Sequence, residues 1–214
     1  MFHLQGSLLE DVAEVGLRSL DVTTRTPLAD GAWVDVRPGW LTGADEVFAR
    51  LHDEVDWRAE RRRMYDRTVP TPRLLRFYDG GEHLPHPVLI DAREALSAHY
   101  AAELGEPFVT AGMCLYRDGA DSVAWHGDDI GRSATHDTMV AIVSLGTPRP
   151  LMLRPHSDRA KADHRGGSLR FHVGHGDLVV MGGSCQRTWQ HAVPKLTGSV
   201  GPRISVQFRP HDVR

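Results

Sequence analysis

Apolar residues recur at helical spacing in two segments of the first hundred residues. Thr42 followed by Asp45 resembles a capping box at the start of the first segment. Its apolar face comprises Val47, Phe48, Leu51 and Val55. Pro87 suits the first turn of a second helix, and Gly105 is a typical C-terminal glycine. The apolar stripe between them comprises Leu89, Ala92, Leu96 and Tyr100. The pattern therefore predicts two amphipathic helices connected by turns.

From Pro107 onward the pattern changes to short runs of β-forming residues separated by Gly, Pro and Asp. The seven predicted strands are residues 108–116, 138–145, 151–154, 169–173, 177–181, 188–193 and 203–209. So many short strands in about a hundred residues are typical of an antiparallel barrel or a two-sheet jelly roll. We therefore expect a mainly β fold with flanking helices. It would form a single domain, 1–214, in which residues 1–106 buttress a core formed by residues 107–214.

Composition and cysteine content narrow the class of protein. A chain of 214 residues with 41% hydrophobic and 25% charged residues is not disordered, collagen-like or a disulfide scaffold. Cys114 and Cys185 form no CxxC pair, which suits a reducing compartment. The first residues lack the basic region of a signal peptide, and no stretch of 18 uncharged apolar residues occurs. We expect a cytoplasmic protein with no membrane partner.

Positive charge is concentrated in residues 58–76, although the whole chain has a net charge of -3. This segment contains seven arginines and only two acids, Glu60 and Asp66, which leaves a local charge of +5. The arginines are Arg58, Arg61, Arg62, Arg63, Arg67, Arg73 and Arg76. One interpretation is a solvated loop. The other is a strip that contacts phosphates, because guanidinium groups match phosphate oxygens and Tyr65, Phe77 and Tyr78 could offer stacking faces.

Three His-x-Asp segments could supply two ligands of a 2-His-1-carboxylate triad, a ligand set that suits non-haem Fe(II). His126 and Asp128 follow a predicted strand and precede the isolated His191 by about sixty residues, enough for a barrel to close between the ligands. The segment 175–177 resembles a tight turn before a strand, and the segment 156–158 lies in a polar stretch without periodicity. We therefore favour the first segment, although a lone motif of this kind is more often a surface loop.

Two arginines near the C-terminus strengthen this choice. Arg203 and Arg209 are six residues apart, and an even offset places both on the same face of a strand. Two arginines that point into a small barrel are costly unless anions meet them. A dicarboxylate cosubstrate would supply those anions.

These residues lie in segments that resemble the AlkB family of Fe(II)/2-oxoglutarate dioxygenases, which reverse alkylation damage on nucleic-acid bases. The matching segments, in the order of the family, are CLYRDGADSVAWHGDD, VAIVSLGTPRPLMLR, GDLVVMGGSCQRTWQHAVPK and RISVQFR. VPTPRLLRFYDGG resembles the proline-arginine segment that precedes the core of the family. The resemblance implies a double-stranded β-helix (jelly-roll) core buttressed by N-terminal helices. Residues 1–106 would include a nucleotide-recognition segment, and residues 107–214 would form the catalytic core.

The resemblance also implies a role for individual residues. His126, Asp128 and His191 would bind Fe(II). Arg203 and Tyr116 would contact the far carboxylate of 2-oxoglutarate, and Arg209 would lie beside the cosubstrate and Asp128. Asp129 matches an acid associated with the substrate base. Further substrate contacts are expected from Tyr65, Tyr78, Arg61, Arg62, Arg63 and Arg73.

The chain departs from the family at two positions that line the expected cosubstrate site. Many members have Asn-x-Tyr where this chain has Cys114-Leu115-Tyr116, and many have Arg-x-Asn where it has Arg203-Ile204-Ser205. Cys114 and Ser205 are therefore expected near the cosubstrate, each in place of an amide. A clear counterpart of the aromatic residue that stacks on the base is also missing, and Tyr65 and Tyr78 are the candidates.

The function implied by the resemblance is oxidative removal of N-alkyl groups from DNA or RNA bases by a monomeric enzyme. Its cofactors would be Fe(II), 2-oxoglutarate and O2, and its products succinate, CO2 and formaldehyde. An oxygenase that hydroxylates a protein side chain or a small molecule is the first alternative. A β barrel that binds metal without turnover, or a nucleic-acid binding module with a vestigial site, is the second.

Overall fold

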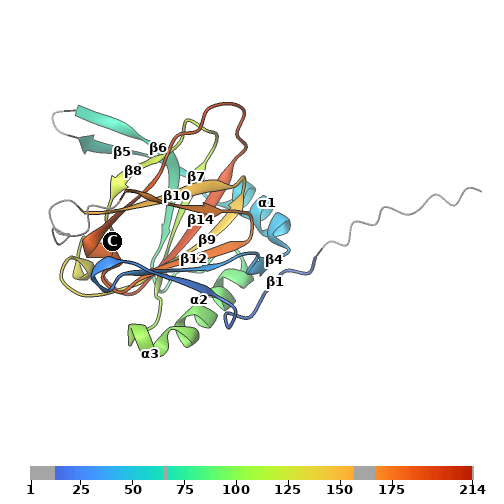
Figure 1. Ribbon diagram of the computed structural model, residues 1–214. Coiled ribbons are helices and arrows are strands. Elements are labelled where there is room, and N and C mark those ends of the chain that lie inside the picture. The colour runs from blue at the N-terminus through green and yellow to red at the C-terminus, as the bar shows by residue number, and fades with distance from the viewer. Residues whose placement is uncertain (1–12, 65–66, 157–166, 214) are drawn as a thin grey trace, which may run out of the picture.

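The computed structural model describes residues 13–64, 67–156 and 167–213, and the side chains of residues 62–70 lie outside this description. Two antiparallel sheets face each other, and helices cover the outer side of the larger one (Figure 1). The larger sheet contains, in order, β2 (Thr24–Pro27), β3 (Trp33–Arg37), β12 (Asp177–Gly182), β9 (Val140–Gly146), β14 (Arg203–Arg209), β7 (Thr110–Tyr116), β6 (Arg67–Tyr78) and β5 (Arg58–Met64). The smaller sheet contains β11 (Leu169–Val173), β10 (Arg149–Pro155), β13 (Trp189–Val193) and β8 (Val123–His126).

The remaining elements are short strands and helices. Strand β1 (Gly16–Leu17) pairs with β4 (Leu41–Thr42). The helices are η1 (Ala29–Gly31), α1 (Ala44–Glu54), α2 (Pro87–His99), α3 (Ala101–Leu104), η2 (Arg132–Ala134) and α4 (Cys185–Thr188). No helix among the described residues is long and apolar enough to cross a membrane.

Alternating side chains on the central strands create two cores. On one face of the large sheet, Met113, Val143 and Val206 pack toward the helices, where Leu51 and Leu89 are fully buried. The opposite faces of the same strands belong to a second core between the two sheets, which includes Tyr116, Ile142, Leu153 and Val193. Period-two alternation therefore lets one set of strands bind the helices on one side and enclose an interior on the other. The predicted two-sheet fold with buttressing helices is confirmed.

The two predicted helices are present, but the first begins differently from the prediction. Residues Val47 and Leu51 are buried as expected. The capping box is wrong, because the N-cap is Gly43 in the left-handed region, at φ 60°. The Thr42 hydroxyl instead donates to the Glu14 carbonyl at 2.8 Å, since Thr42 belongs to strand β4. In the second helix Pro87 occupies the first turn as predicted, and Gly105 ends α3 at φ 74°.

All seven predicted strands are present, and the described part of the chain contains seven others that the sequence analysis missed. Strand β8 and six strands of the N-terminal half were not predicted. Four of these N-terminal strands extend the large sheet on both sides, so the N-terminal segment contributes strands as well as helices. The arginine-rich segment is not a loop: it forms the β5–β6 hairpin at the edge of the large sheet, and β6 pairs with β7 (Figure 1).

Candidate active site

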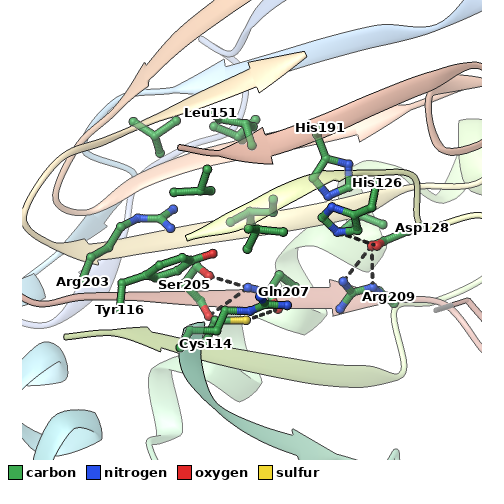
Figure 2. Close-up of a pocket in the computed structure, with 17 residues that line it drawn as sticks. Cys114, Tyr116, His126, Asp128, Leu151, His191, Arg203, Ser205, Gln207 and Arg209 are labelled. Carbon is green, nitrogen blue, oxygen red and sulfur yellow. Dashed lines mark hydrogen bonds and ion pairs between the residues drawn. The ribbon is translucent and has the colours of Figure 1, made fainter. Parts of the chain in front are cut away.

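A pocket lies between the two sheets, and one strand of the large sheet contributes four of its polar lining residues. On β14, residues Arg203, Ser205, Gln207 and Arg209 all line the pocket, while the residues between them pack toward the helices. Arg203 lies at one end of the pocket, and a cluster of two histidines and an aspartate lies at the other (Figure 2). The pocket therefore joins a cationic end to a cluster of metal-binding side chains.

Pairing of β8 with β13 builds this cluster. The register places His126 directly opposite His191, and their ring centroids are 4.2 Å apart. Asp128 follows two residues after His126, and its Oδ1 lies 3.6 Å from His126 Nε2. One ligand atom from each of the three residues lies within 4.8 Å of the other two. Side chains from two distant parts of the sequence thus converge as the spacing predicted.

Neighbouring groups keep the three side chains in forms that bind a cation. The Nδ1 of His126 lies 2.9 Å from the Ala124 carbonyl, which can only accept, so Nδ1 carries a hydrogen and Nε2 is the ring nitrogen that could bind a metal. Burial and the adjacent His126 lower the pKa of His191 to about 3, so its ring is neutral at pH 7. Two imidazole rings and one carboxylate form a donor set that suits Fe(II).

Arg209 controls the third ligand, Asp128. Its guanidinium donates to Asp128 Oδ2 from Nε at 3.0 Å and from Nη2 at 2.7 Å. Burial alone would raise the pKa of Asp128, but the Arg209 charge and the two histidines outweigh it and hold this pKa well below its ordinary value. Arg209 binds one carboxylate oxygen, which leaves Oδ1 facing His126. Arg209 thus orients the Asp128 carboxylate within the cluster.

The opposite end of the pocket is suited to a carboxylate. Arg203 is only 3% exposed, and its Nε donates to the Ser144 hydroxyl at 2.9 Å. Its Nη1 is buried and has no hydrogen-bond partner within the described residues. Tyr116 lies directly opposite Arg203 in the sheet, and burial followed by the Cys114 thiol raises its pKa to about 12, so it keeps its proton. A buried cation with an unused donor beside a protonated phenol fits an anionic ligand.

Of the other predicted site residues, some line the pocket and others do not. Cys114 and Ser205 line the pocket, and the sheet register places them opposite each other. Arg73 on β6 also lines it, and its Nη1 donates to the Ser122 carbonyl at 3.3 Å. Asp129 is half-buried, and it is not among the residues that line the pocket.

The predicted substrate contacts on the hairpin and at its end are less well supported. Arg61 is exposed on β5, and the structure places it away from the pocket lining. The backbones of Arg62 and Arg63 lie on β5, but their side chains are outside the description, as is Tyr65. Tyr78 is buried in the core beneath the helices, under the Arg76 guanidinium. That position does not suit a platform for a base, because the ring has no open face toward the pocket.

The sequence analysis missed one residue that lines the pocket and one buried residue beside it. Gln207 is 9% exposed and lines the pocket between Ser205 and Arg209. Its even offset from Arg203 and Arg209 is a signal that could have identified it. Arg149 is 1% exposed and donates to the carbonyls of Asp118, Asp121 and Pro194 near Tyr116. No sequence pattern could identify Arg149, because its partners are backbone carbonyls.

The described residues of the two rejected His-x-Asp segments lie outside the cluster. In the second segment, His175 Nδ1 accepts from the Gly146 amide and Asp177 accepts from the Gly174 and Gly39 amides. The bond from Gly174 closes a local turn, as expected from the sequence, and the other two connect this turn to distant segments. Of the third segment, Asp158 lies outside the described residues.

Comparisons with known proteins identify the family of this chain. The model of the 2OG-Fe(II) oxygenase superfamily matches residues 38–209. Alpha-ketoglutarate-dependent dioxygenase alkB homolog 3 of Bos taurus is 32% identical over 194 residues, which cover 80% of this chain and 64% of that protein. The Homo sapiens protein of that name is 31% identical over 222 residues, which cover 94% of this chain and 70% of that protein. DNA oxidative demethylase ALKBH2 of Homo sapiens is 27% identical over 78% of this chain and 68% of that protein.

Solved structures share the fold at lower sequence identity. The structure of OsALKBH1 matches with a TM-score of 0.57 and 14% identity, covering 88% of this chain and 100% of that chain. A Pseudomonas putida prolyl-4-hydroxylase matches with a TM-score of 0.55 and 17% identity, covering 83% of this chain and 92% of that chain. These likenesses support the jelly-roll architecture alone.

The family match covers most of the chain and includes every member of the metal-binding cluster, so the protein belongs to the 2OG-Fe(II) oxygenase superfamily. Fe(II), 2-oxoglutarate and O2 are the cofactors that this superfamily implies, and the donor set fits the metal. Within the superfamily the chain belongs to the AlkB family, as the alkB homolog 3 of Homo sapiens shows. The match spans about 64% of the length of the first Bos taurus relative.

Proposed function

We propose that this protein removes N-methyl groups from alkylated nucleic-acid bases. With Fe(II), 2-oxoglutarate and O2 bound, the site would hydroxylate the methyl carbon, and the cosubstrate would lose CO2 to become succinate. The hydroxymethyl group then leaves as formaldehyde, and the proton of its hydroxyl returns to the base nitrogen. One oxygen atom of O2 ends in succinate and the other in formaldehyde.

In this proposal the residues of the pocket bind and orient rather than exchange protons. His126, Asp128 and His191 would hold Fe(II), and Arg209 would keep Asp128 ionised and oriented. Arg203 and Tyr116 would bind the far carboxylate of 2-oxoglutarate. No acid–base residue is required at the methyl carbon, so the contribution of the protein is to position the reacting groups and exclude water.

The observation that carries the nucleic-acid substrate is the position of the arginine-rich hairpin. Strand β6 belongs to this hairpin, and its residue Arg73 lines the pocket that contains the metal-binding cluster. Arg61 is exposed on the adjacent strand β5. Guanidinium groups on this hairpin, one of which lines the pocket, could bind phosphates while one base enters the site. The base would be supplied from a single strand or flipped out of a duplex.

The name of the Homo sapiens relative, DNA oxidative demethylase ALKBH2, supports the same substrate class. One observation favours the alternative of a hydroxylase for a protein side chain or small molecule. Apart from the two histidines, Tyr116 is the only aromatic residue among the described residues that line the pocket, and it lies beside Arg203. A base would therefore lack a tyrosine or tryptophan platform in this part of the structure.

A direct assay separates these functions. The iron-loaded protein would be incubated with 2-oxoglutarate and oligonucleotides that carry methylated bases, in single- and double-stranded form. The proposal expects restored base by mass spectrometry together with formaldehyde and succinate. Succinate without any restored base, across all the methylated oligonucleotides, would overturn it in favour of the hydroxylase.

We also propose that the enzyme is monomeric and acts in a reducing, cytoplasmic environment. Cys114 and Cys185 are both buried and form no disulfide. Free thiols of this kind support a reducing compartment. Size-exclusion chromatography with light scattering tests the oligomeric state, and a dimer at micromolar concentration would overturn that part of the proposal.

A further inference from the structure

Gln207 lies in the middle of the pocket floor and has no role in the proposals above. It faces the pocket between Ser205 and Arg209, and it is 9% exposed (Figure 2). The residue opposite it in β7 is Gly112. A Cβ at Gly112 would lie 3.2 Å from Gln207 Oε1 and 3.0 Å from Arg209 Nη1. The absence of a side chain at residue 112 therefore leaves room for the long amide of Gln207.

Two neighbours determine the orientation of this amide. Gln207 Nε2 lies 3.1 Å from the Ser205 carbonyl oxygen, and a carbonyl oxygen can only accept. The same nitrogen also donates to the Ser205 hydroxyl oxygen. Gln207 Oε1 accepts from the Cys114 thiol at 3.8 Å. The amide is therefore a donor toward Ser205 and an acceptor toward Cys114. In the reverse orientation, Gln207 Oε1 would face the Ser205 carbonyl oxygen, and both of these atoms are acceptors.

Tyr116 lies in the same part of the pocket as Ser205 and Arg203 (Figure 2). Burial raises the pKa of Tyr116, and the Arg203 charge and hydrogen bonding with the Ser205 hydroxyl act in the opposite direction. Arg203 can only donate, so it can approach the phenol oxygen only at a lone pair. If Ser205 also donates to Tyr116, both acceptor sites of the phenol are used. The phenol hydrogen is then available for a further acceptor beside Arg203, whose Nη1 has no partner in the described structure.

We infer that Gln207 is a positioning residue for the cosubstrate. By donating to Ser205, it directs the Ser205 hydroxyl hydrogen to Tyr116, and Tyr116 in turn donates its hydrogen to the far carboxylate of 2-oxoglutarate. One amide on β14 thus contacts both Cys114 and Ser205, the two positions at which this chain lacks the amides that many AlkB members have. The inference depends on the cosubstrate of the superfamily and not on the identity of the oxidised substrate.

The test compares two ligands that differ only in the group that Tyr116 would bind. Binding of 2-oxoglutarate and of 2-oxopentanoate, which lacks the far carboxylate, is measured by calorimetry with Mn(II) in place of Fe(II). Q207L should weaken 2-oxoglutarate binding by about tenfold and 2-oxopentanoate binding by less than about twofold. An equal loss for both ligands, or no loss for either, would overturn the inference, because a merely structural role affects both alike.

A double-mutant cycle with S205A tests whether Gln207 acts through Ser205. Once the Ser205 hydroxyl is absent, Q207L should have almost no further effect on 2-oxoglutarate binding, whereas independent effects would multiply. Multiplication of the two effects would overturn the proposed line of hydrogen bonds. Q207E keeps the shape of the side chain but cannot donate to Ser205, so it should show the same selective loss if Q207L does not fold.

Q190L provides a matched control. Gln190 lies on β13, where its side chain accepts from Arg154 rather than facing the pocket. Its replacement should leave both affinities unchanged, and a selective loss like that of Q207L would also overturn the inference. Because these assays need no nucleic acid, their outcome is independent of the demethylation assay proposed above.

Discussion

At the scale of single residues, Asp128 connects the metal-binding cluster to the cationic lining of the pocket. One of its oxygens faces His126 and the other accepts two hydrogen bonds from Arg209. The Asp128 side chain is 7% exposed and that of Arg209 is 16% exposed. Water therefore screens this ion pair only in part, and each partner depends on the other. The aspartate that would bind Fe(II) is also the group that neutralises Arg209.

Replacement of Asp128 by alanine should therefore have two separate effects. Mn(II) affinity, measured by calorimetry, and 2-oxoglutarate decarboxylation, measured as succinate, should both fall by more than about 100-fold, because one ligand of three is lost. Unfolding free energy should fall by about 1–3 kcal/mol, because Arg209 loses its partner. Asp129→Ala is the matched control next in sequence and should retain the metal. Succinate production by the Asp128 variant at the wild-type rate would contradict the assignment.

Strand β14 shows how far single residues can be predicted from the sequence. The parity argument for Arg203 and Arg209 correctly placed both in the pocket. It applies equally to Gln207, which lies at an even offset from both arginines but was not predicted as a site residue. Arg149 could not be predicted at all, since its three acceptors are carbonyls on segments that meet only in the folded chain.

At the scale of elements, the strands that the sequence predicted are those with apolar residues at close spacing. Strand β14 alternates polar and apolar residues, and both sets are used, one in the pocket and one beneath the helices. Strand β5, by contrast, contains four arginines and a glutamate in seven residues, and no local pattern distinguishes it from a loop. It forms because β6 pairs with β7 and offers a free edge. Tertiary context, rather than propensity, therefore determines the hairpin.

The β5–β6 hairpin leads to a prediction about oligonucleotide binding. Neutralising Arg61, Arg62 and Arg63 together with glutamine should weaken binding of single-stranded oligonucleotides and lower the salt slope of log K by about 2, if each contacts one phosphate. Fluorescence anisotropy at several salt concentrations measures both quantities. The control neutralises Arg37, Arg50 and Arg93, which lie on β3, α1 and α2, and should leave the slope near the wild-type value. Equal slopes for wild type and the hairpin variant would contradict a phosphate-binding strip.

The N-cap of α1 leads to a prediction about the stability of the protein. Gly43 has φ 60°, and a Cβ there would lie 2.7 Å from the Ala13 carbonyl oxygen and from Val15 Cα. Gly43→Ala should lower the free energy of unfolding by about 2–4 kcal/mol, because strain and a backbone clash add. Gly105 has φ 74° but no atom near its missing Cβ, so Gly105→Ala should cost only about 1 kcal/mol. Urea unfolding measures both, and equal losses would show that the close approach at Gly43 is unimportant.

At the scale of the whole molecule, the two ends of the pocket are held by different parts of the fold. The metal-binding cluster depends on the pairing of β8 with β13 in the small sheet, whereas Arg203 and Tyr116 lie on paired strands of the large sheet. A ligand that touches both ends would therefore connect the two sheets. The sequence analysis predicted the three residues of the cluster. It did not predict that the two ends of the pocket lie on different sheets, because it did not identify β8, the strand that contains His126.

Ligand binding should consequently stabilise the protein in two separable steps. Mn(II) should raise the melting temperature, and 2-oxoglutarate at about 100 times its Kd should add about 2.7 kcal/mol, or several degrees for a domain of this size. In Arg203→Met the Mn(II) step should remain and the 2-oxoglutarate step should disappear. Without ligands this variant should melt above the wild type, because it removes a buried guanidinium that has an unused donor. Differential scanning fluorimetry measures all six states, three for each protein, and a full 2-oxoglutarate step in Arg203→Met would show that the carboxylate binds elsewhere.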